Sequence, residues 1–156
     1  DARPEWSFLF ILADESTGDD DEHDFFRLRN VHLLGWKPVA TLPDYLHFAD
    51  VGLLPPSTLA DNRIYPRALL LRLIGAGLPV VSGYPVHEPL FTGIVTHAPR
   101  PEDAVLAIRQ AMGKAHLEPF SRRCAELVAA EDWSVLIRSP LAAIEPVLKE
   151  RRSRPA

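Results

Sequence analysis

The stretch from Ile64 to Ser82, IYPRALLLRLIGAGLPVVS, constrains the fold more than any other part of the chain. Pro66 opens its helical part, because the first turn of a helix tolerates the absence of the backbone N–H group that proline lacks. An apolar run follows and ends in a Gly-Ala-Gly turn, after which Pro79 leads a short β-branched segment. This order predicts a helix over 66–75 and then a buried strand, which is the repeating unit of an α/β sheet.

Four further apolar runs are predicted strands, and helical patterns separate them. We expect the strands over 6–13, 30–35, 51–54, 79–82 and 93–97, and the other helices over 39–50, 101–114, 117–130 and 132–149. The first run, WSFLFILA, is continuous, which is typical of a strand buried on both faces of a parallel sheet. The alternation predicts an α/β domain with a mainly parallel sheet. We expect one domain over 1–150 and a disordered tail over 151–156.

Helical spacing also predicts which side chains face the core. In the 39–50 helix, one face carries Leu42, Tyr45, Leu46 and Ala49. Thr41 is expected to cap the start of that helix, because a proline follows in its first turn. In the 66–75 helix, the expected core residues are Leu69, Leu70, Leu71, Leu73 and Ile74.

Composition excludes several classes of protein. The chain has 156 residues, 47% of them hydrophobic, and a formal net charge of −4. This acidic balance disfavours nucleic acid as a partner. A single cysteine, Cys124, rules out an internal disulfide and is compatible with a reducing compartment. The expected location is the cytoplasm, and association with a membrane through a missing portion of the protein stays open. No apolar run reaches the roughly 18–20 residues of a membrane-spanning helix, and no direct membrane span is expected.

Common catalytic and metal-binding motifs are not found in the sequence. The first predicted strand is followed by neither a dinucleotide-binding glycine pattern nor a Walker-type loop, and there is no Gly-x-Ser-x-Gly elbow. The histidines are scattered, with His32 and His47 expected at the surfaces of their elements, so no metal site is predicted. The acidic run DESTGDDDEHD over 14–24 is interpreted as a solvated loop rather than a metal motif. Ligands of parallel sheets bind beyond the carboxyl ends of the strands, which directs attention to the loops after Ala13, Leu34, Leu54 and Ser82.

An ordered set of five segments carries a family resemblance. The segments are ARPEWSFLFIL, LRNVHLLGWKPVATLPDYLHFADVGLLP, YPRALLLRLIGAGLPVVSG, EPLFTGIVTHAPRPEDAVLAI and EDWSVLIRSPLAAIEPVL. In this order and at these intervals the chain resembles the C-terminal, nucleotide-sugar-binding half of retaining glycosyltransferases of the GT-B fold (glycosyl transferases group 1, family 4-like). The resemblance implies a Rossmann-like, three-layer domain that binds a UDP- or GDP-linked sugar for glycan or polysaccharide synthesis. It also implies that no metal or other cofactor is needed.

The resemblance implies a set of donor-binding residues. The helix that opens near Pro66 would present its N–H groups to the diphosphate, and the loop after the second strand would frame the base. The residues carried over are Gly35, Trp36, Asn62, Arg63, Pro66 and Arg67. Trp36 is either a wall on which the base stacks or a lid over the edge of the core. Arg63 and Arg67 either bind an anion or form surface salt bridges.

Two acidic residues of the family pattern are missing. Arg67, or Ala68 with a one-residue gap, stands where the family has a lysine, and Arg72 or Leu71 stands where it has a glutamate. Ile64 occupies the place of the other glutamate. Asp61 or Asn62 could therefore handle the sugar nucleotide, and Glu88, after the next strand, is a further candidate for holding the donor. The catalytic residues stay unknown.

The resemblance also implies parts that precede this chain in the family. The family domain begins with a strand of the Gly-Tyr-x-Gly type, which lies at the centre of the order 3-2-1-4-5-6. The acceptor-binding N-terminal domain comes before that strand. We therefore expect a fragment, or one product of a split gene, that needs a second polypeptide and does not transfer sugar alone. Two other interpretations stay open, a non-catalytic partner module derived from such an enzyme and an α/β enzyme similar to sugar-nucleotide epimerases.

Overall fold

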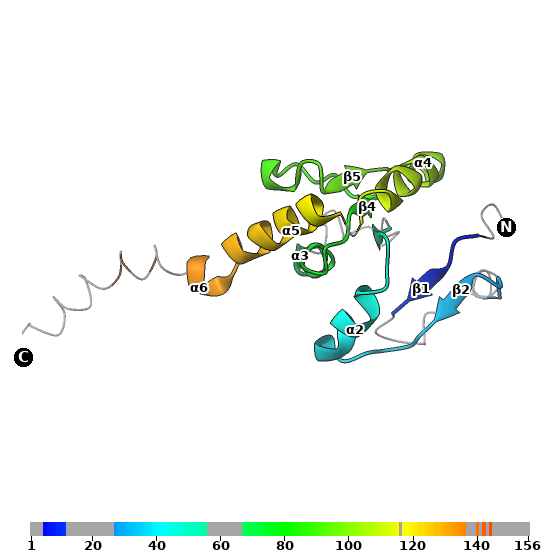
Figure 1. The fold of residues 1–156 in the computed structure, drawn as a ribbon, viewed down its shortest axis with the longest axis horizontal. Helices are drawn as coiled ribbons and strands as arrows, with labels where there is room; N and C mark the ends of the chain where they lie inside the picture. The colour runs from blue at the N-terminus through cyan, green and yellow to red at the C-terminus, as the bar shows by residue number, and fades with distance from the viewer. Residues whose placement is uncertain are drawn as a thin grey trace, which may run out of the picture. The chain divides into compact units, whose positions relative to one another are not determined.

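The computed structural model describes residues 5–11, 27–55, 67–115 and 117–136, together with residues 140, 142 and 144. These residues form two compact units divided between Tyr45 and Leu46. The first unit begins with β1 (Phe8–Phe10), β2 (Val31–Leu33) and η1 (Val39–Thr41), and α2 (Leu42–Leu46) runs across the division. The second continues with β3 (Gly52–Leu54), α3 (Arg67–Gly75), β4 (Val80–Ser82), η2 (Pro89–Phe91), β5 (Val95–His97), α4 (Pro101–Met112), α5 (Glu118–Ala130) and α6 (Trp133–Leu136) (Figure 1).

The described strands pair in parallel, which confirms the α/β class. In the first unit β1 pairs with β2, with Leu9 opposite His32. In the second unit the order is β3-β4-β5, with β4 in the middle. Each described strand lies inside a predicted one, and the helices alternate with the strands as expected.

The described strands form a two-stranded and a three-stranded sheet. β1 pairs only with β2 and β3 only with β4 among the described strands. The first strand and the N-terminal domain that the resemblance implies stay predictions.

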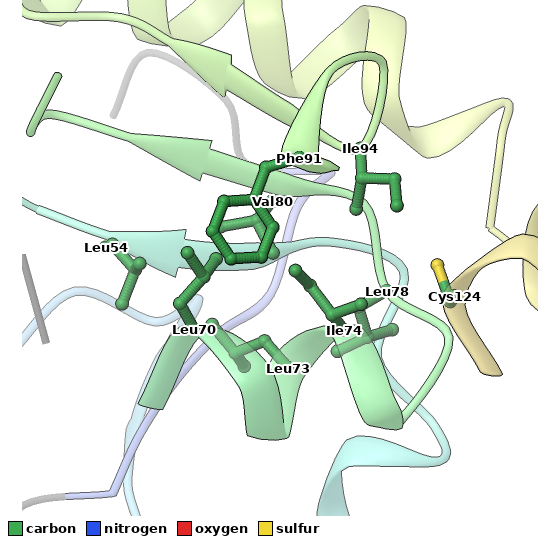
Figure 2. Close-up of a cluster of buried hydrophobic side chains, with 9 residues drawn as sticks. All are labelled: Leu54, Leu70, Leu73, Ile74, Leu78, Val80, Phe91, Ile94 and Cys124. Atoms are coloured by element: carbon green, nitrogen blue, oxygen red, sulfur yellow. The ribbon is translucent and has the colours of Figure 1, made fainter. Parts of the chain in front are cut away.

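The second unit has three layers, with the main core between α3 and the sheet. The side chains of this core are Leu54, Leu70, Leu73, Ile74, Leu78, Val80, Phe91, Ile94 and Cys124. Figure 2 shows the apolar face of α3 turned toward β3 and β4, while Cys124 approaches from α5. Val81 points to the opposite face of β4, where it packs against Ala107 and Ala111 of α4. Strand β4 is therefore buried on both faces, as its β-branched sequence predicts.

The prediction that the first strand is buried on both faces was wrong. The side chain of Leu9, at the centre of β1, is 55% exposed. Phe8 and Phe10, which point the other way, are half-buried. Within the described part of the first unit no helix covers the face of β1 that carries Leu9. The apolar sequence of β1 was therefore not sufficient for burial of both of its faces.

The predicted helix over 39–50 is shorter than expected. It consists of the 3-10 turn η1 and the five-residue α2, and a turn begins after Leu46. The hydroxyl of Thr41 donates a hydrogen bond to the carbonyl of Pro38 at 2.9 Å, so Thr41 closes η1 instead of capping α2. The predicted face is nevertheless correct, because Leu42, Tyr45, Leu46 and Ala49 are all half-buried.

One predicted core residue of α3 is exposed. Leu70, Leu73 and Ile74 are buried, and Leu71 packs against them. The prediction for Leu69 was wrong, because its side chain is 38% exposed. A helix buries only one stripe of its surface against the core. Leu69, like the neighbouring Ala68, is exposed and lies outside that stripe.

The Gly-Ala-Gly turn ends α3 with a defined hydrogen-bond pattern. Gly77 has a φ of +78°, and its N–H group donates to the carbonyl of Ile74 at 2.8 Å. The N–H group of Leu78 donates to the carbonyl of Leu73 at 3.2 Å, and both side chains belong to the same core. This is a Schellman motif, which turns the chain from α3 into β4.

Replacing Gly77 with alanine is expected to destabilise the protein through the backbone alone. A Cβ at this position would meet nothing closer than the Ser121 hydroxyl at 3.6 Å, so there is room for the methyl group. The cost is the left-handed conformation, about 1 kcal/mol, and a fall in Tm of roughly 2–4 °C. Thermal unfolding followed by circular dichroism measures it, and Gly113→Ala is the control because Gly113 has αR geometry and open space around it. An unchanged Tm in Gly77→Ala would contradict the Schellman assignment.

No helix among the described residues is long and apolar enough to cross a membrane. Of the predicted last helix over 132–149, the structure describes α6 and three single positions beyond it. The predicted tail over 151–156 and the acidic run over 14–24 lie outside the described residues.

Candidate functional site

The carboxyl ends of β3 and β4 meet at one edge of the three-stranded sheet. The two strands are parallel and in register, with Leu54 opposite Ser82. Helix α3 returns the chain antiparallel to the strands, so its first residue, Arg67, belongs to the same edge. The segment that leaves β4 leads to Glu88 at this edge. Parallel α/β sheets bind their ligands here.

A serine turn holds the segment that leaves β4. Ser82 is fully buried, and its hydroxyl donates to the carbonyl of Tyr84 at 3.0 Å. The N–H group of Tyr84 lies 3.0 Å from the same hydroxyl oxygen. The carbonyl of Glu88 accepts a hydrogen bond from the N–H group of Phe91 at 3.1 Å, which closes η2. The backbone of the segment is thus anchored at both ends.

The guanidinium group of Arg67 joins three parts of the second unit. Its Nη1 donates to Oε2 of Glu88, and its Nη2 donates to Oε2 of Glu131. Its Cζ lies 5.4 Å from the centre of the Phe91 ring, within the range of a cation–π contact. The start of α3, the segment before η2 and the end of α5 therefore meet at this one side chain.

The charges of this cluster do not cancel. One guanidinium faces two carboxylates, so the three side chains sum to −1 when all are ionised. An arginine at the N-terminus of a helix also lies near the positive end of the helix dipole, which disfavours a cation and favours anions. The carboxylates of Glu88 and Glu131 thus supply the negative charge that this helix end favours.

The two carboxylates are held differently. Glu131 follows the last residue of the 13-residue α5, and its N–H group donates to the carbonyls of Leu127 and Val128. Arg123 of the same helix donates to the carbonyl of Thr92 at 2.6 Å and so ties α5 to the chain after η2. Glu88 lies in a segment without regular structure. Its side chain is 36% exposed, against 19% for Glu131.

The predicted base-framing loop lies in the first unit. Gly35 adopts a φ of +67°, which turns the chain sharply after β2. The ammonium of Lys37 donates to the carbonyl of Leu34 and lies 5.8 Å from the centre of the Tyr45 ring. Between them the side chain of Trp36 is 62% exposed. Both interpretations of Trp36, a wall on which a base stacks and a lid over the edge of the core, stay predictions.

The predicted donor-binding residues fall into three groups. Gly35 and Trp36 belong to the first unit, and Arg67 belongs to the second. The remaining ones, Asn62, Arg63 and Pro66, lie outside the described residues, as do Asp61 and Ile64. Arg67 has both carboxylate partners, so the salt-bridge alternative describes its state in this structure.

Glu131 and Phe91 were not identified from the sequence as neighbours of Arg67. Glu131 is 64 positions away along the chain, and no local pattern connects the two. The one available signal was its place after the predicted helix over 117–130. A helix that runs in the same direction as the parallel strands ends near their carboxyl ends. The sequence does not show which helix runs in this direction.

The described residues contain no group of three histidine, cysteine, aspartate or glutamate side chains that could hold a metal ion. His32 and His47 are exposed on their elements, as predicted.

Comparison with known proteins identifies a distant relative. The chain is 26% identical over 141 residues to a putative teichuronic acid biosynthesis glycosyltransferase, TuaH, from Bacillus subtilis (strain 168). The match covers 87% of this chain and 35% of the relative, so the chain spans about a third of the length of the protein it matches. No family model matches the chain, and no solved structure matches it. The chain is similar to a glycosyltransferase over most of its length.

Proposed function

We propose that this chain is the donor-binding half of a GT-B glycosyltransferase. It would bind a UDP- or GDP-linked sugar and take part in transferring that sugar to a glycan or polysaccharide. The observation that carries the proposal is the similarity to TuaH over 87% of the chain. The name of that relative, which refers to teichuronic acid biosynthesis, is the reason to favour an acceptor of the polysaccharide class.

The chemistry of the carboxyl edge supports a diphosphate ligand. The start of α3 offers backbone N–H groups that have no partner within the helix, and such groups bind phosphate. Arg67 adds a planar guanidinium that can pair with two phosphate oxygens. Both would stabilise the charge that develops on the diphosphate as the bond to the sugar breaks.

We also propose that a second region of protein binds the acceptor and that the reaction takes place in the cytoplasm. The chain corresponds to about a third of its relative, so an acceptor-binding region would come from another domain or polypeptide. Sugar transfer by this chain alone is not expected. The lone, reduced Cys124 is compatible with the cytoplasm, where we place the reaction.

Replacing Arg67 with methionine is expected to weaken the binding of UDP or GDP by roughly 10- to 100-fold. The guanidinium would be lost while the length of the side chain is kept. Isothermal titration calorimetry of the purified chain with UDP, GDP and their sugars measures the change.

The control is Arg109→Met, which removes the same charge from another helix. Arg109 is exposed in the last turn of α4, the helix that packs on the opposite face of β4 from α3, so its variant should bind within about twofold of the unchanged chain. Equal losses of nucleotide affinity in both variants would show that the effect of Arg67→Met comes from the change in net charge alone. Binding that does not respond to Arg67→Met would place the diphosphate elsewhere.

One observation favours a second candidate, a non-catalytic partner module. Within α3 there is no carboxylate at Leu71 or Arg72, where the family has a glutamate. A chain that binds neither UDP, GDP nor any of their sugars would favour this module over the enzyme.

A further inference from the structure

We draw no further inference here: the strongest candidate, the exposed face of β1 that carries Leu9 in the two-stranded sheet, is a surface for which nothing in the described part of the chain shows what covers it.

Discussion

Replacing Leu70 with alanine is expected to lower the free energy of unfolding by about 2–5 kcal/mol. Leu70 has no exposed surface and lies in the middle of the core between α3 and the sheet (Figure 2). The loss has two parts, the free energy that burial of the removed atoms contributed and the cost of the cavity left among the neighbouring side chains. Small domains are stable by only about 5–15 kcal/mol, so this one change removes a large share of the total. Chemical unfolding in urea, followed by circular dichroism, measures the loss.

The control for this prediction lies one residue earlier. Leu69→Ala makes the same chemical change on the same helix at a side chain that is 38% exposed. Leucine and alanine have similar helix propensities, so a cost under about 1 kcal/mol is expected. Similar losses for both variants would mean that α3 does not present the face described above.

Cys124 is expected to react with a thiol reagent at least about 100-fold more slowly in the folded chain than in the unfolded chain. Burial raises the pKa of the Cys124 thiol from 9.0 to about 11, and the positive charge of Arg123 offsets this only in part. At any pH below 9 the rise alone removes about 99% of the reactive thiolate. The thiol is also only 1% exposed, so the reagent has little access to it.

Labelling with Ellman's reagent at pH 8 tests this prediction, with the chain in strong denaturant as the reference. The rate should rise along the unfolding curve, because Cys124 packs in the same core as Ile74 and Leu78. Fast labelling in buffer, at a rate unaffected by denaturant, would show that α5 does not cover this core.

Local chemistry predicted most of the second unit. The apolar run and the Gly-Ala-Gly turn predicted α3, its end and the buried strand β4, because both signals act within a few residues. The same signals failed where burial depends on a neighbour. Leu9 and Leu69 were predicted to be buried, but nothing in the described part of their units covers them. Hydrophobicity favours burial and does not supply the element that produces it.

The candidate site was predicted less completely, for the same reason. Arg67 was identified by its place at the start of a helix, and Gly35 and Trp36 by their place after a strand. Phe91 and Glu131, two of the partners of Arg67, were not identified from the sequence, and the place of Glu131 after a predicted helix was the one signal available. Glu88 was a candidate for holding the donor, which stays a prediction, and the structure shows its carboxylate bound to Arg67.

The sequence by itself determined the order of strands and helices, the parallel class of the sheet and the position of a cation at the start of α3. These features depend on periodicity, turns and helix ends, which are encoded within short segments. Only the tertiary structure decided that Arg67 is bound by Glu88 and Glu131. Contacts between residues 21 and 64 positions apart form when the elements pack, and no short-range pattern in the chain specifies them.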